Sequence, residues 1–159
     1  MCSPSIGAVR RRAGRAPSKA NGAAGVMCGT AFSVRSESLV HPNLKRAAVA
    51  GEGDRTLRSS VIDVARDIPW PEEFNIRTLR NGFIEQWADD VVGLRASRAQ
   101  EQARYAQGHD AGDPEVSAVI VGEGIDLIHA ETGAGDVVRG MVGEAESRLR
   151  AAAAILQSA

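Results

Sequence analysis

The sequence predicts an α/β protein in which a short buried strand near the start is followed by a mostly helical region. The strand is predicted by the apolar run Val26-Met27-Cys28, which follows small residues and stops at Gly29-Thr30, a pattern typical of a buried strand that ends in a turn. The helical end is predicted over 136–156 by an apolar stripe at helical spacing. That stripe consists of Val138, Met141, Val142, Ala145, Leu149, Ala152 and Leu156.

Between these two ends the pattern favours helices and short extended segments in alternation. Pro42 suits the first turn of a helix, and Gly51 its end, so we expect a helix over 42–50. A second helix is predicted over 76–89, where Ile76, Leu79, Phe83, Ile84 and Trp87 share one face. The remaining expected segments are a strand or extended stretch over 56–64, a proline-containing loop over 67–71, a solvated helix over 96–107, a loop over 108–114 and apolar runs over 116–121 and 125–128.

Composition excludes several classes of function. The chain is 43% hydrophobic and 25% charged with a net charge of −1, so nothing in it favours nucleic acid or an acidic membrane surface as a partner. Its apolar runs are too short to span a bilayer, which argues against a membrane protein. The two cysteines, Cys2 and Cys28, are expected to be free thiols in a reducing compartment, and we therefore expect a cytoplasmic protein.

Residues 1–21 are basic and carry almost no large apolar side chains. The basic residues Arg10, Arg11, Arg12, Arg15 and Lys19 precede the first acidic residue, Glu37. Three interpretations stay open: a disordered tail, an arginine-rich transit peptide, and an arm that contacts phosphate.

The turn after the predicted strand suits a phosphate-bearing ligand. Gly29 would let a ligand approach the backbone closely, and Thr30 offers both a hydroxyl and an N–H group. No metal-ligand spacing, Ser-His-Asp context or dinucleotide fingerprint occurs in the sequence.

Four ordered motifs resemble the nitronate monooxygenase (2-nitropropane dioxygenase) family. The first, Gly25 to Phe32, is close to the family pattern G-V-x-x-G-T-R-F, with Ala31 where the family has arginine. The others are His41-Pro42-Asn43-Leu44-Lys45, the run Arg77 to Phe83 with the later Trp87, and Gly122 to His129. The resemblance covers about 22–152, most of the chain.

The resemblance implies that residues 22–159 are the C-terminal part of an FMN-binding (β/α)8 TIM barrel, formed by the last barrel strand and the helical region. Members of that family oxidise alkyl nitronates and nitroalkanes with O2, using FMN. By position, Met27, Cys28, Gly29 and Thr30 are the expected FMN contacts. No catalytic or metal-ligating residue is assigned. The small nitronate or nitroalkane substrate and FMN are the expected ligands.

The departures from the family pattern bear on activity. The family's catalytic histidine lies upstream in a glycine-rich motif that has no counterpart here, and His41, His109 and His129 follow the phosphate loop instead. His41 is expected to cap a helix, His109 to be exposed in a loop, and His129 to be packed or capping. The match stops at Asn21, so we also hypothesise that residues 1–21 come from a shifted reading frame or a misassigned start. We therefore do not expect turnover from this chain alone.

Two further functions stay open. The C-terminal helices would also suit a non-catalytic interaction module whose basic N-terminal arm contacts an acidic partner. A domain that binds a phosphate-bearing ligand without catalysis is the third alternative.

Overall fold

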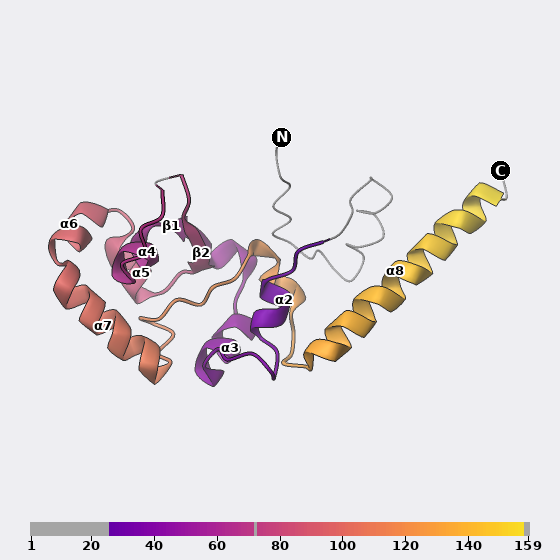
Figure 1. Ribbon diagram of the computed structural model, residues 1–159, viewed down its shortest axis with the longest axis horizontal. Coiled ribbons are helices and arrows are strands. Elements are labelled where there is room, and N and C mark those ends of the chain that lie inside the picture. Colours follow the sequence, from indigo (N-terminus) through magenta and orange to yellow (C-terminus); the bar gives the residue numbers. More distant parts are fainter. Residues whose placement is uncertain (1–25, 72, 158–159) are drawn as a thin grey trace.

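The computed structural model describes residues 26–71 and 73–157, which form an α/β fold that is mostly helical (Figure 1). In chain order, the elements are α2 (Thr30–Ser33), α3 (Pro42–Val49), η1 (Gly53–Arg55), β1 (Thr56–Ser59), α4 (Val61–Ala65), β2 (Ile76–Leu79), α5 (Gly82–Trp87), α6 (Val91–Ala96), α7 (Arg98–Ala111), η2 (Glu123–Leu127) and α8 (Ala134–Gln157). The segment 1–21, whose origin the sequence leaves open, lies outside the described residues, as does Cys2.

The two strands form one antiparallel sheet in the middle of this region. Thr56 pairs with Leu79, and Ser59 pairs with Ile76. The extended segment around Ile120 lies along the free edge of β2, where Ile120 bridges Thr78. The N–H of Leu79 donates to the carbonyl of Val119 at 2.9 Å, so this segment extends the sheet by a short, irregular third edge.

The larger apolar core lies under α4, α5, α6 and α7. Val61, Ile62, Phe83, Ile84 and Leu94 are all completely buried there. Tyr105 of α7 meets Phe83 edge to face, with 5.9 Å between ring centroids. Burial of these large side chains is the main source of stability for this half of the chain.

A second core joins α3 to η2 and to the segment along β2. It is formed by Val34, Leu44, Ala48, Leu79, Val119, Val121 and Ile125. Its members come from widely separated parts of the sequence, so this core fixes the loop after α2 against the end of the sheet.

Asn81 links three segments through one side chain. Its Oδ1 accepts the N–H of Ile84 at 3.0 Å and so caps α5. Its Nδ2 donates to the carbonyls of Pro114 at 2.8 Å and Ser117 at 2.9 Å. The N–H of the next residue, Gly82, donates to Oε2 of Glu115 at 3.1 Å.

Several predicted elements are confirmed. The helix predicted over 42–50 is α3, and His41 caps it by accepting the N–H of Asn43 on Nδ1. The helices predicted over 96–107 and 136–156 are α7 and α8, although α7 continues to Ala111. His109 is exposed as expected, but it lies in the last turn of α7 rather than in a loop.

Other predictions are wrong. Val26, Met27 and Cys28 form no strand, because no described segment pairs with them, and Met27 is 78% exposed. The helix predicted over 76–89 is β2 followed by α5, with Gly82 at the first position of α5 rather than in a helix interior. The extended stretch predicted over 56–64 ends at Ser59, after which α4 begins. His129 is exposed rather than packed.

Helix α8 extends away from the rest of the chain (Figure 1). Glu37 holds its first residue, since both carboxylate oxygens accept the N–H of Ala134 at 3.0 Å. That hydrogen bond lowers the pKa of Glu37.

No helix in the described part of the chain is long and apolar enough to cross a membrane.

Candidate functional site

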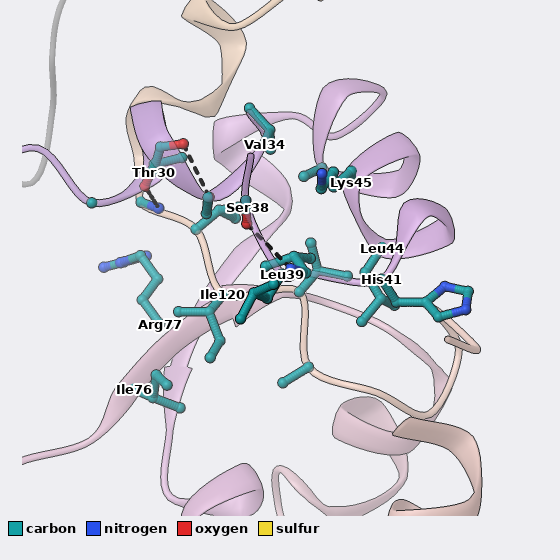
Figure 2. A pocket seen from close by; sticks show the side chains of 18 of the residues that line it. Thr30, Val34, Ser38, Leu39, His41, Leu44, Lys45, Ile76, Arg77 and Ile120 are labelled. Atoms are coloured by element: carbon teal, nitrogen blue, oxygen red, sulfur yellow. Dashed lines mark hydrogen bonds between the residues drawn. The ribbon is translucent and has the colours of Figure 1, made fainter. Parts of the chain in front are cut away.

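An open hollow of about 1290 Å³ lies between the loop after Cys28, the start of α3 and the edge of β2. Its volume suits a ligand of mononucleotide size. The side chains that line it include Thr30, Ser38, Leu39, Lys45, Ile76, Arg77 and Ile120 (Figure 2).

Gly29 gives this hollow an open stretch of backbone. A Cβ atom built on Gly29 meets nothing within 4 Å, so the backbone is accessible to a ligand. Its φ of −87° and ψ of −65° are values that any residue adopts, so a side chain here would occupy the hollow without straining the backbone. Close approach to a ligand, rather than backbone conformation, is therefore what glycine provides at this position.

Thr30 is held beside Gly29 by a long-range hydrogen bond. Its Oγ accepts the N–H of Gly122 at 2.8 Å, and its carbonyl accepts the hydroxyl of Ser33 at 3.0 Å. The Thr30 hydroxyl keeps its own hydrogen for donation, because it acts as the acceptor toward Gly122. The loop after Cys28 is thus fixed to the turn that starts η2.

Arg77 supplies positive charge next to this loop. Its Nη2 lies 2.9 Å from Oε1 of Glu123, the residue after Gly122, and its Nη1 donates to Oγ1 of Thr56 at 2.9 Å. The Arg77 side chain is 30% exposed, so it remains accessible from the hollow. Figure 2 shows it extending from β2 on the side of the hollow where Thr30 lies.

Two buried cations lie behind the loop. Lys45 donates to the carbonyl of Arg35 at 2.7 Å and pairs with Glu131 at 3.3 Å. Arg35 donates to the carbonyl of Ala31 at 2.5 Å and to the hydroxyl of Thr132. Burial lowers the pKa of the Arg35 guanidinium, while the nearby Glu131 acts in the opposite direction. These contacts fasten the segment before α8 to α2 and α3.

Apolar side chains also line the hollow. Leu39, Val40 and Ile120 are exposed and line it, together with the half-buried Ile76. The hollow therefore offers exposed hydrocarbon as well as polar and charged groups.

Two histidines also line the hollow, and both have structural contacts. The His41 ring lies against Gly112, which has φ +62°, and its Nδ1 caps α3. His109 places Nδ1 3.0 Å from Oγ of Ser117 and stacks on Tyr105 with 6.0 Å between ring centroids. In the described residues, no group of three or more His, Cys, Asp or Glu side chains is placed to hold a metal ion.

Of the four residues predicted from the sequence to contact FMN, two line the hollow and two do not. Gly29 and Thr30 line the hollow, whereas Met27 and Cys28 precede it without lining it. Cys28 is a half-buried free thiol. Arg77, Lys45 and Gly122 also line the hollow. They lie within the sequence motifs, but their roles depend on contacts across the fold.

Comparison with known proteins identifies the fold. No protein-family model matches the sequence, and no curated protein sequence matches it. Among solved structures, a single-substitution mutant of FabK from Thermotoga maritima is 22% identical, with a TM-score of 0.63 over 89% of this chain and 40% of that chain. FabK from the same organism is 21% identical, with a TM-score of 0.62 over 88% of this chain and 42% of that chain.

The likeness shows that the described chain shares its fold with a part of these TIM-barrel chains. This chain spans about two fifths of the length of the FabK chains that it matches.

Proposed function

We propose that this chain is part of a flavin-dependent oxidoreductase of the TIM-barrel superfamily to which FabK belongs. The fold likeness to FabK, an enoyl-ACP reductase that depends on flavin, supports the proposal. The observation that carries it is the open backbone at Gly29, beside the Thr30 hydroxyl and facing a hollow large enough for a mononucleotide.

The proposed cofactor is FMN, and the proposed contacts to it are Met27, Cys28, Gly29 and Thr30. The residues present suit a phosphate: Gly29 allows close approach of the backbone, Thr30 offers a hydroxyl hydrogen, and Arg77, which pairs with Glu123, lines the same hollow. Met27, which is exposed before the loop, would cover part of the ligand with its flexible apolar side chain.

The proposed reaction is the oxidation of an alkyl nitronate or nitroalkane with O2. FMN, when bound, would supply the redox chemistry, and this chain would bind and orient the phosphate end. The apolar side chains of Leu39, Val40 and Ile120 would exclude water from part of the ligand. No catalytic base is assigned to this chain, because His41 and His109 have structural contacts and His129 lies outside the hollow.

The phosphate contact is tested by titrating the full chain with FMN and with riboflavin, which lacks the phosphate. We expect FMN to bind and riboflavin to bind at least about tenfold more weakly, because the charged hydrogen bonds are lost. The variant Gly29→Glu introduces bulk and negative charge where a Cβ meets nothing, so it should abolish FMN binding without unfolding the chain.

Gly140→Glu is the matched control. A Cβ on Gly140 also meets nothing within 4 Å, and the same charge is added far from the hollow, on α8. FMN affinity unchanged by Gly29→Glu, or equal affinity for riboflavin and FMN, would overturn the phosphate contact. Oxygen uptake with propyl-2-nitronate, compared with consumption of a reduced nicotinamide in the presence of an enoyl thioester, distinguishes nitronate oxidation from the chemistry of FabK.

A non-catalytic helical interaction module is the second candidate. The observation that favours it is α8, whose apolar stripe is exposed along a projecting helix. Failure of the full chain to bind FMN, together with a stable fold, would support the module over the flavoprotein. The basic arm 1–21 that would contact an acidic partner lies outside the described residues.

A further inference from the structure

Helix α8 carries an apolar stripe that little covers in the described part of the chain. Val138 is 46% exposed, Val142 is 38% exposed and Leu149 is 46% exposed. None of the described side chains of α8 is buried, and among the other elements its closest neighbour is the short α2. At 24 residues, α8 is about 36 Å long, so most of its length extends beyond the rest of the fold.

Five residues of the stripe have the spacing of a coiled-coil seam. Val138, Val142, Ala145, Leu149 and Ala152 follow one another at alternating intervals of four and three residues. This is the a/d pattern that keeps an apolar seam facing a second helix along its whole length. The two alanines alternate with larger side chains, which allows a close approach of two helices.

We propose that α8 pairs in antiparallel orientation with α8 of a second copy of this chain. With Val142 of one copy opposite Ala145 of the other, large and small side chains interdigitate in the central layers of the seam. The proposal does not depend on flavin binding, because α8 contributes no residue to the hollow.

Charge supports the antiparallel orientation. Arg139 and Glu146 flank the same side of the stripe, and antiparallel pairing brings Arg139 of one copy within reach of Glu146 of the other, twice by symmetry. On the opposite side of the stripe, Arg148 falls beside Met141 of the second copy, where its hydrocarbon stem covers the thioether. A parallel pair would instead place Arg148 opposite Ala153. It would form neither of the two symmetry-related ion pairs between Arg139 and Glu146.

The shape of the molecule supports the same orientation. The first residue of α8 is held to the body by Glu37, and its last residues point away from the body (Figure 1). Antiparallel pairing places the two bodies at opposite ends of the helix pair. Parallel pairing would bring both bodies to the same end, where they would compete for space.

Sedimentation velocity of the full chain over a range of concentrations tests the proposal. We expect a dimer at micromolar concentrations, and we expect Leu149→Glu to weaken dimerisation by at least about tenfold, because it buries a charge in the seam. The matched control is Ser147→Glu, which adds the same charge two residues away on the opposite face of the helix. Circular dichroism of each variant verifies that the helix content is retained.

A charge exchange tests the orientation. Arg139→Glu and Glu146→Arg should each weaken the dimer, and the double variant should restore it. A chain that remains monomeric at all concentrations, or a dimer that Leu149→Glu leaves intact, would overturn the proposal. A dimer that is lost in Leu149→Glu but is not restored by the double exchange would overturn the antiparallel pairing. A stripe covered instead by another polypeptide would give the monomeric result.

Discussion

The α4–α7 core is packed around completely buried apolar side chains, whereas the segments around the hollow combine a second apolar core with hydrogen bonds from buried charged groups. In the first region, Phe83, Ile62 and Leu94 are completely buried and exclude water through apolar contact. In the second region, Lys45 and Arg35 hold backbone carbonyls, and Asp126 accepts the N–H of Gly53 at 2.7 Å. Apolar packing thus dominates beside the sheet, while directional polar contacts add to apolar packing around a loop whose backbone stays open to a ligand.

The strongest test of this contrast is Phe83→Ala. Phe83 is completely buried, and the Arg104 guanidinium lies 5.3 Å from its ring centroid. Its removal leaves a cavity, so we expect the free energy of unfolding to fall by about 3–5 kcal/mol in denaturant titrations. Phe74→Ala is the control, since Phe74 is 57% exposed and should change stability by less than about 0.5 kcal/mol. Similar losses for both variants would contradict the assignment of Phe83 to the main core.

A smaller effect is expected for Lys45→Met in the polar region. The substitution preserves much of the apolar stem but leaves the carbonyl of Arg35 and the carboxylate of Glu131 without their partner. We expect a loss of about 2 kcal/mol in the free energy of unfolding. We also expect weaker FMN binding, because the loop before α3 loses its hydrogen bond from Lys45. Its neighbour Arg46 is exposed, so Arg46→Met should cost less than about 1 kcal/mol and leave FMN affinity unchanged. Equal effects of the two variants would indicate that Lys45 contributes only as a surface charge.

The smallest effect concerns Asp63, one of the buried charged groups in the α4–α7 region. Asp63 is 4% exposed, its Oδ2 accepts the N–H of Ile76 at 3.3 Å, and burial raises the pKa of its carboxyl. The folded state therefore holds the proton more tightly than the unfolded state. Stability should fall as pH rises from the unfolded pKa to the raised folded pKa, by at most about 1.4 kcal/mol per pH unit, and should then level off.

Asp63→Asn removes this titration while it preserves an acceptor for Ile76. Denaturant unfolding measured between pH 3 and pH 8 should therefore show a flatter profile for the variant than for the unmodified chain. Parallel profiles for the two proteins would mean that another group produces the pH dependence.

The sequence predicts the elements that depend on local signals better than those that depend on distant contacts. Helices α3, α7 and α8 follow from local signals: a proline in the first turn, a polar run of helix formers and an apolar stripe. Ile76, Leu79 and Phe83 share helical spacing by coincidence, so the pattern predicts a helix where the chain forms β2. The decisive feature is Asn81, whose side chain caps α5 and so separates the strand from the helix.

The candidate site was predicted in part. Gly29 and Thr30 could be singled out because a small residue next to a hydroxyl after an apolar run is a local pattern. Arg77 and Gly122 could not, since their places in the site depend on contacts with Glu123 and Thr30, and the bond from Gly122 to Thr30 joins residues 92 positions apart. The strand predicted over Val26–Cys28 failed because strand formation requires a neighbour, which a local pattern does not reveal.

The contacts of Asn81 have a consequence for the chemical ageing of the protein. An asparagine followed by glycine deamidates when the glycine nitrogen attacks the side-chain carbon of the asparagine. Here the Asn81 amide is held by Ile84, Pro114 and Ser117, and the Gly82 nitrogen is engaged by Glu115, so the folded chain keeps the two reacting atoms from meeting. An acidic residue found at position 81 would therefore identify molecules in which these contacts have broken at least once since synthesis.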